Sequence, residues 1–256
     1  MPTALALSPH LDDAAFSCGG TLATLERAQW RVLMVTVFTG SVADPQGFAL
    51  ACQTDKGLSP EVDYMALRRD EDRAAARALL IERPRHLGFR EAPHRGYASA
   101  PELFGEVRPD DSIVPELAAA FRDLIDETQP DLLLAPQAIG GHVDHVQVVR
   151  ALQASVSQRP ILWWRDFPYT VRTQAPKEPL RAHFAELPVR TIRFDRGAEV
   201  RKEAACAAYA SQLGFQFGGR PGLRERLARE SGVERFRLSG MLPAGIAGLV
   251  TADAAS

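Results

Sequence analysis

Two short stretches of the chain combine imidazole and carboxylate side chains at a spacing that suits metal chemistry. Ser8–Asp13 follows an apolar run from Ala4 to Leu7. Gly141–His145 follows a second apolar run, from Leu132 to Ala135. Such runs are typical of buried strands, and open α/β sheets bind ligands beyond the carboxyl ends of their strands. The stretches contribute His10, Asp12, Asp13, His142, Asp144 and His145, enough for a zinc centre of two histidines and one carboxylate with acid and base groups to spare.

The first stretch can divide two tasks between adjacent carboxylates. Asp12 and Asp13 point in different directions on extended or loop backbone, so one can ligate a metal ion while the other faces the substrate as a general base. His10 lies on the same turn and can supply a neutral imidazole nitrogen to the same ion. The alternative is structural, because aspartates routinely cap helices and a helix is expected from Ala15 to Trp30.

The second stretch places two histidines on one face of a helical turn. His142 and His145 are three residues apart, so one can bind metal while the other stabilises an oxyanion or protonates a leaving group. Asp144 can orient whichever imidazole it reaches. One alternative is a pair of ordinary surface or core histidines. Another is magnesium and phosphoryl chemistry, but histidine ligands favour zinc over an all-oxygen shell.

The composition of the 256 residues is that of a globular enzyme, with 46% hydrophobic and 24% charged residues. A formal net charge of -2 offers no basis for nucleic acid or an anionic membrane as a partner. Cys18, Cys52 and Cys206 are odd in number and far apart, which disfavours a disulfide framework. We therefore expect a cytoplasmic protein without a signal peptide or a membrane span. Its partner is expected to be a small molecule, with a homo-oligomer left open.

The alternation of strand-like and helix-like segments predicts one α/β domain over residues 1–256, with a Rossmann-like, mainly parallel sheet and helices on both faces. Strands are expected at Thr3–Leu7, Val32–Phe38, Pro84–Phe89, Asp131–Ala135, Ile161–Trp164 and Leu187–Phe194. Helices are expected at Ala15–Trp30 and Glu61–Leu80, from Asp111 or Ser112 to Thr128, after His142, and at Ala198–Leu213. Two irregular segments, 39–60 and 90–109, interrupt the pattern, and long loops in compact domains are often functional.

Several motifs, taken together, resemble the PIG-L/LmbE-like deacetylase family. They are His10–Asp13, Cys18–Ala23, Arg68–Asp72, Gly141–Val146 and Tyr209–Gln212. They occur in the same order as in the family and span about the whole chain. The resemblance implies a Rossmann-like fold, one bound zinc ion per chain, and removal of acetyl or related acyl groups from the amine of glucosamine-type sugars.

The resemblance also implies a role for each matching residue. His10, Asp13 and His145 become the zinc ligands, and Asp12 becomes the general base. His142 becomes the group that stabilises the tetrahedral oxyanion or protonates the departing amine, with Asp144 as its orienting partner.

Other positions bear on the substrate. Arg68 matches a family arginine that often lies near substrate, and its alternative role is an i,i+3 pair with Glu71. Leu11 and Val143 stand where proline is common in the family, and Ala14 stands where glutamate often follows the two aspartates. These departures remove no ligand and no base, so they bear on fine positioning and on the substrate subgroup.

The leading interpretation is a zinc-dependent hydrolase that deacetylates an N-acetylglucosamine-type sugar or glycoside by metal-activated water. Alternatives are an amidase acting on a larger amide, such as a glucosamine–thiol conjugate, and a non-catalytic carbohydrate-binding protein, which the presence of Asp12 disfavours. Because the metal motifs fix only the attack on the acyl carbon, segments 39–60 and 90–109 are expected to border the cleft and to read the rest of the substrate. Arg68, Glu91 and Arg95 are the substrate-binding residues that we expect.

Overall fold

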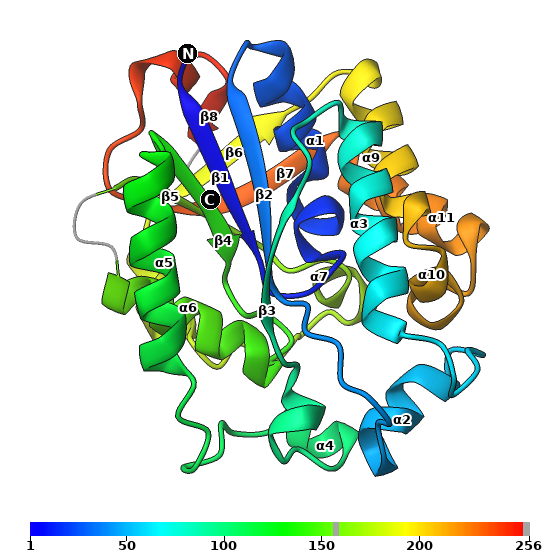
Figure 1. Cartoon of the computed structure of the whole chain (residues 1–256). Helices are drawn as coiled ribbons and strands as arrows, with labels where there is room; N and C mark the ends of the chain where they lie inside the picture. The colour runs from blue at the N-terminus through cyan, green and yellow to red at the C-terminus, as the bar shows by residue number, and fades with distance from the viewer. Residues whose placement is uncertain (156–158, 253–256) are drawn as a thin grey trace.

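A twisted central sheet organises the computed structural model, which describes residues 1–155 and 159–252 (Figure 1). Its strands are β1 Thr3–Ser8, β2 Arg31–Phe38, β3 Arg85–Phe89, β4 Leu132–Pro136, β5 Ile161–Trp164, β6 Val189–Arg193, β7 Val233–Ser239 and β8 Val250–Ala252. Their order is β3-β2-β1-β4-β5-β7-β6-β8. The strands from β1 to β5 pair in parallel, and β6, β7 and β8 add antiparallel pairs at one edge. The predicted mainly parallel, Rossmann-like sheet is confirmed.

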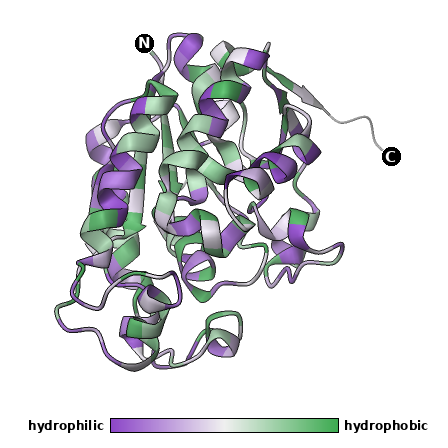
Figure 2. Ribbon diagram, turned by 90° about the vertical axis from the view of Figure 1, so that its right-hand side faces the viewer, coloured by the Kyte–Doolittle hydropathy of each residue, from purple (hydrophilic) through white to green (hydrophobic). Residues whose placement is uncertain are grey.

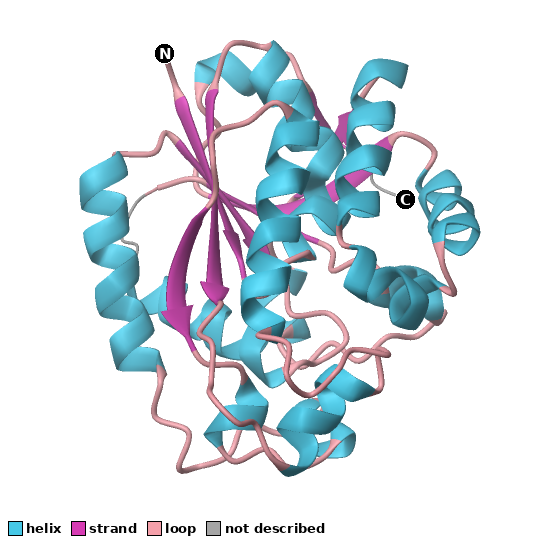
Figure 3. Ribbon diagram, turned by 45° about the vertical axis from the view of Figure 1, so that its right-hand side comes forward, coloured by secondary structure: helices cyan, strands magenta, loops and turns pink. Residues whose placement is uncertain are grey.

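Helices cover both faces of this sheet (Figure 3). In the described residues they are α1 Asp13–Arg27, α2 Gly47–Thr54, α3 Tyr64–Leu79, η1 Ala92–Arg95, α4 Ala100–Leu103, α5 Val114–Thr128, α6 Val143–Ser155, α7 Tyr169–Arg172, α8 Arg181–Ala185, α9 Arg196–Ala208, α10 Ala210–Phe217, α11 Arg220–Glu230 and η2 Ala244–Ile246. Residues of α1, α3 and α9 pack on one face, and residues of α5 and α6 pack on the other. No helix in this part of the chain combines the length and the apolarity that a membrane crossing requires.

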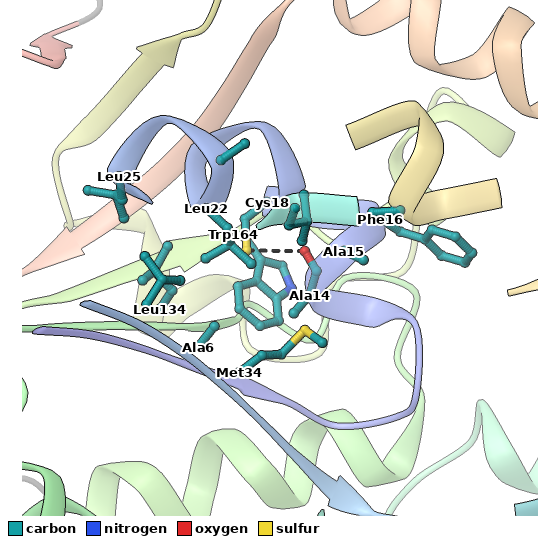
Figure 4. Packing of buried hydrophobic residues seen from close by; sticks show 14 of the residues in the cluster. Ala6, Ala14, Ala15, Phe16, Cys18, Leu22, Leu25, Met34, Leu134 and Trp164 are labelled. Atoms are coloured by element: carbon teal, nitrogen blue, oxygen red, sulfur yellow. Dashed lines mark hydrogen bonds between the residues drawn. The ribbon is translucent and has the colours of Figure 1, made fainter. Parts of the chain in front are cut away.

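Two apolar layers explain why β1 reads as a continuous hydrophobic run. Ala4 and Ala6 belong to the core beneath α1, whereas Leu5 and Leu7 belong to the core beneath α5 and α6. A strand covered on both faces has no solvated side and therefore needs no polar alternation. The hydropathy colouring shows the apolar residues gathered on the central strands and on the inner sides of the helices (Figure 2). Cys18 packs in the same core as Ala4 and Ala6, and its Sγ donates to the carbonyl of Ala14 at 3.2 Å (Figure 4).

The structure corrects several sequence-based expectations. Segment 39–60 contains α2, and segment 90–109 contains η1 and α4, so neither is wholly irregular. The single helix predicted for Ala198–Leu213 is two helices, because Tyr209 leaves helical geometry at φ -82 and ψ 61. This break buries the Tyr209 ring completely and lets its hydroxyl donate to Asp72 Oδ1 of α3 at 2.6 Å. Neither Asp111 nor Ser112 caps α5, which begins after Ile113 without a side-chain cap.

The chain after α10 was not assigned elements from the sequence, although β7 carried a readable signal. Val233, Phe236 and Leu238 are buried, while Arg235 is exposed. β7 lies between β5 and β6 and runs antiparallel to both. Because β7 pairs with a strand on each side, it belongs to the main sheet.

A buried ion pair connects β7 to a break in α1. Cys18 has non-helical geometry inside α1, and the carboxylate of Glu234 accepts the backbone N–H groups of Gly20 and Thr21 just beyond it, at 2.9 and 2.7 Å. The same carboxylate lies 2.8 Å from the ammonium of Lys202. An added Cβ on Gly20 would meet the ring of Phe194 at 2.5 Å, so this glycine allows close packing. Glu234, which lies on a strand distant in the chain, thus accepts the backbone N–H groups that a local helix cap would otherwise accept.

Replacement of Glu234 by alanine should destabilise the protein strongly. The change leaves the ammonium of Lys202 with one buried partner fewer and leaves two backbone donors unpaired. Removal of one partner from a buried ion pair costs about 3–5 kcal/mol. Glu225→Ala, which removes an exposed i,i+4 partner of Arg229, should cost about 0–1 kcal/mol. Urea denaturation measures both losses, and equal midpoints for the two variants would contradict the role given to Glu234.

Candidate metal centre

The two polar stretches meet where the winding of the sheet reverses. β1 pairs with β2 on one side and with β4 on the other, so the carboxyl ends of β1 and β4 form a topological switch point. His10 lies just beyond β1, and Asp13 begins α1. His142 and His145 lie at the start of α6, which follows β4 after a short turn. All six residues of the two stretches are brought to this end of the sheet.

Three ligand-type atoms form a compact triangle at this point. Asp13 Oδ2 lies 3.3 Å from His10 Nδ1 and 3.1 Å from His145 Nε2. The two imidazole nitrogens are 3.3 Å apart. Ligand atoms about 2.0–2.1 Å from a tetrahedral metal ion stand roughly 3.3 Å from one another, so the triangle has the right size. The donor set of two nitrogens and one carboxylate oxygen also matches what zinc accepts.

The electrostatics of the triangle call for a cation. Burial alone would lower the pKa of His10, but its hydrogen bonds to Asp13 and Asp144 raise that pKa to about 9. Burial is likewise outweighed at His145, where Asp13 and Asp166 raise the pKa well above its ordinary value. Carboxylates that draw protons onto two imidazoles will also attract a divalent ion. The residues therefore fit a metal by size, by chemistry and by charge.

Each triangle histidine is held from behind by a further carboxylate. His10 Nε2 lies 2.9 Å from Asp144 Oδ2, and His145 Nδ1 lies 2.8 Å from Asp166 Oδ1. This pattern fixes the tautomer of a metal-binding histidine and orients its ring. Asp144 was expected to orient His142, but its carboxylate is 3.9 Å from His142 Nδ1 and contacts His10 instead.

Sequence reasoning missed Asp166. It lies just past β5, the strand next to β4, and is fully buried. Its other oxygen accepts the backbone N–H of Ile139 at 2.9 Å, so it also holds the loop that precedes the second stretch. The signal was available, since an acid directly after a buried parallel strand is the rule that singled out Asp12 and Asp13.

His142 lies beside the triangle with one ring nitrogen already engaged. Its Nδ1 accepts the backbone N–H of Asp144 at 3.2 Å, so the proton of the neutral ring is on Nε2. Burial, with the charge on His10, lowers the pKa of His142 well below its ordinary value. A neutral imidazole with a free Nε2–H is a hydrogen-bond donor. The three rings lie close together, because one nitrogen of each lies within 4.8 Å of a nitrogen of the other two, in His10, His142 and His145.

Asp12 lies outside the triangle but close to it. Burial and the charge of Asp13 raise the pKa of Asp12 to about 7, against the opposing charge of Arg68. Arg68 Nη2 lies 3.6 Å from Asp12 Oδ2, and its Nη1 is 2.7 Å from Glu91 Oε1. A carboxyl group with a pKa near neutrality can both take up and release a proton.

A cavity of about 330 Å³ opens above these groups. Segment 39–60 lines it with Phe48, Cys52, Asp55 and Lys56, and segment 90–109 lines it with Glu91, Pro93, Ala100, Leu103 and Phe104. Both segments thus border the cleft as expected, together with residues of α7 and α10. Arg68 and Glu91 line the cavity too.

Arg95 is placed differently from the other two expected substrate-binding residues. It is not among the residues that line the cavity. Its guanidinium lies 2.8 Å from Asp144 Oδ1 and 2.9 Å from Asp111 Oδ2. These contacts put Arg95 behind the His10–Asp144 pair and favour a role in holding Asp144, in place of a contact with substrate.

The fold and the site define an α/β protein with a candidate metal centre at the carboxyl ends of its parallel strands. The chain belongs to the family described as PIG-L: GlcNAc-PI de-N-acetylase, which matches residues 5–156.

Individual relatives agree with the family. The chain is 35% identical over 173 residues to a 2'-N-acetylparomamine deacetylase from Streptomyces fradiae, a match that spans 67% of this chain and 59% of the relative. It is 30% identical over 233 residues to a 2'-N-acetylparomamine deacetylase from Niallia circulans, covering 83% of this chain and 81% of that one. A crystal structure of the zinc-inhibited form of teicoplanin deacetylase Orf2 superposes with a TM-score of 0.78 and 29% identity, over 93% of this chain and 98% of that one.

Loss of Asp166 should weaken divalent metal binding without removing a triangle atom. Asp166→Ala frees the ring of His145 from its only carboxylate partner at Nδ1 in the described residues, and changes of this kind typically cost about 10- to 100-fold in affinity. Asp166→Asn, which keeps a hydrogen-bond acceptor, should lose less. Competition of the apoprotein with a zinc-binding dye measures the affinities, and Asp126→Ala, an exposed acid, is the control. Unchanged affinity in Asp166→Ala would exclude the orienting role.

Proposed function

We propose that the protein is a zinc-dependent N-deacetylase that removes an acetyl group from the amine of an N-acetylglucosamine-type sugar or glycoside. The observation that carries the proposal is the His10–Asp13–His145 triangle at the floor of an open cavity, with Asp12 and His142 beside it. The named activities of the relatives, 2'-N-acetylparomamine deacetylase and teicoplanin deacetylase, support the same chemistry.

In this proposal His10, Asp13 and His145 hold the ion, and a bound zinc ion supplies a Lewis acid that makes water nucleophilic near neutral pH and polarises an acyl oxygen. That a related deacetylase is described in a zinc-inhibited form supports binding of zinc by a site of this kind. The three cysteines are free, which supports a cytoplasmic setting.

Asp12 and His142 carry the proton and the charge. Asp12 takes a proton from the water that attacks the acetyl carbon, and His142 donates its Nε2–H to the oxygen that becomes negative in the tetrahedral intermediate. The carbon–nitrogen bond then breaks, and the proton on Asp12 is available to the departing amine. The products are acetate and the free amino sugar, so one water is consumed per amide cleaved. Arg68 and Glu91 lie where they can bind sugar hydroxyl groups.

Replacement of any triangle residue should remove the metal and the activity together. His10→Ala, Asp13→Ala and His145→Ala should each lower zinc content far below one ion per chain, because each removes one of three closely spaced ligand atoms. His183→Ala changes an exposed histidine far from the triangle and should keep both properties. Elemental analysis and acetate release from N-acetylated amino sugars are the readouts. Full zinc content in all three variants would refute the ligand assignment, and zinc-loaded protein inactive on every such sugar would refute the proposed reaction.

Asp12→Asn should separate metal binding from chemistry. The amide keeps the shape of the carboxylate but cannot accept the proton, so zinc content should persist while kcat falls about 10²- to 10⁴-fold. Single-turnover acetate release and zinc content, measured on the same preparation, test this outcome. Turnover close to that of the unmodified protein would show that another group is the base.

A further inference from the structure

The cavity lining has two groups of aromatic residues. The first lies against the histidines: the ring of Phe104 is 5.3 Å from that of His142 and 5.9 Å from that of Tyr169. Tyr169 in turn lies 6.2 Å from His145. This region is the immediate surrounding of the candidate metal centre.

The second region lies beyond Arg68 and consists of Lys56, Tyr64 and Phe215, which we call the lysine–aromatic group. The guanidinium carbon of Arg68 is 5.2 Å from the Tyr64 ring centre. The ammonium of Lys56 lies 5.2 Å from the same centre and 5.1 Å from the centre of the Phe215 ring. These residues come from the turn after α2, from α3 and from α10, and all three line the cavity.

The lysine–aromatic group leaves both apolar surface and positive charge available. Phe215 is 61% exposed although it lines the cavity. Lys56 is half-buried and donates to the carbonyl of Cys52, and no carboxylate forms an ion pair with it in the described residues. Arg172, also at the cavity, has no ion pair within the same residues; its guanidinium carbon lies 5.8 Å from the Tyr169 ring centre, and it donates to the carbonyl of Gln216, so it lies between the two aromatic groups. Among the charged lining residues other than Arg68 and the acids Asp12, Asp13, Glu91 and Asp144, two are cations, Lys56 and Arg172, and one is an anion, Asp55.

The wall that carries Phe215 is held in place by hydrogen bonds. Ser211, at the start of α10, donates its N–H and its hydroxyl to the two oxygens of Glu71, each at 2.7 Å. Gln212 donates to the hydroxyl of Tyr64 at 3.0 Å. A preorganised wall loses little conformational entropy when a ligand packs against it. Phe215 is therefore exposed on a supported surface.

The proposed reaction determines which part of the substrate meets each region. His142 donates to the acyl oxygen, so the acyl group lies on the side of Phe104 and Tyr169. Arg68 and Glu91 lie on the other side, next to Asp12, where the sugar ring would be bound. A substituent on the sugar that points away from the acetamido group then extends past Arg68 to the lysine–aromatic group.

We propose that the substrate is a glycoside whose aglycone carries an aromatic ring and a carboxylate. The ring packs on Phe215 and Tyr64, and the carboxylate pairs with the ammonium of Lys56. A cationic aglycone would instead meet Lys56 and Arg172 with like charge, which disfavours it. This inference rests on the proposed deacetylation and adds the chemical class of the group attached to the sugar.

Three glycosides of N-acetylglucosamine test the inference: the methyl, the phenyl and the 4-carboxyphenyl glycoside. We expect kcat/KM to rise in that order. Phe215→Ala should lower the phenyl-to-methyl ratio about 3- to 10-fold, the range of a single aromatic contact. Lys56→Gln should lower the carboxyphenyl-to-phenyl ratio by a similar factor, about 3- to 10-fold, while Lys56→Arg should largely preserve it.

Controls separate these effects from general damage. Met241→Ala removes an apolar side chain that is 86% exposed, and Arg83→Gln removes an exposed charge outside the cavity lining; neither should change a ratio. Equal kcat/KM values for the three glycosides, or ratios insensitive to Phe215 and Lys56, would overturn the inference. If Phe215→Ala instead impairs a methyl glycoside with a longer N-acyl chain, the group binds the acyl side and the inference is wrong.

The inference can fail independently of the proposed reaction. If no glycoside is deacetylated, the reaction is refuted, and calorimetric binding of the three corresponding 2-amino glycosides to the unmodified protein then decides the inference. Tighter binding of the carboxyphenyl compound, lost in Lys56→Gln, supports an aromatic, acid-bearing ligand even then. Equal affinities of the three compounds would overturn it.

Discussion

Three hydrogen-bond acceptor atoms, His10 Nδ1, His145 Nε2 and Asp13 Oδ2, are held close together at the end of the sheet. The nitrogens of two imidazoles face each other at 3.3 Å, with a carboxylate oxygen equally close. Such an arrangement is stable only when a cation lies among the atoms, as protons or as a metal ion. The surrounding structure supplies the rest of the constraint, since Asp144 and Asp166 hold the outer nitrogens of His10 and His145. Neither ring can turn away without losing a buried hydrogen bond.

This constraint extends outward through charged pairs. Asp144 forms an ion pair with Arg95, and Arg95 forms a second one with Asp111. Asp111 also accepts a hydrogen bond from the hydroxyl of Tyr97 at 3.0 Å. The pairs thereby fasten segment 90–109 to the start of α6. A second connection runs from Asp12 through Arg68 to Glu91. Buried charges are costly unless they are paired, so the sequence of the segment is tied to the geometry of the floor.

The cavity changes character with distance from this floor. Near the triangle the available groups are acids, imidazoles and paired guanidinium groups, together with the rings of Phe104 and Tyr169. Farther out the walls are aromatic rings and two cations without ion-pair partners in the described residues. A site built in this way would divide its work in the proposed reaction, with the floor acting on a small acyl group that many substrates share. The outer wall would then contact whatever that group is attached to, and there members of one family can differ without any change in chemistry.

The comparison of sequence and structure follows the range over which each interaction acts. Strand polarity and hydrophobic pattern are local, so the sequence alone indicated that His10, Asp12 and Asp13 follow one buried strand and that His142 and His145 follow another. The parallel sheet makes the ends of those strands meet. The sequence could also indicate that segments 39–60 and 90–109 border the cleft, because loops after strands emerge at that same edge.

Tertiary structure alone decided which partner each group takes. Asp144 is two residues from His142, yet its carboxylate contacts His10, more than a hundred residues away, because the backbone of α6 turns it toward β1. Arg95 was read as a substrate contact but is drawn to Asp144 and Asp111. Phe215 and Lys56 carried no visible pattern, since they become neighbours only when α10 lies beside the turn that follows α2. Residue type and spacing therefore determined the chemistry available to this protein, whereas the pairing of its charges and the shape of its cavity depend on contacts between segments that are distant in the chain.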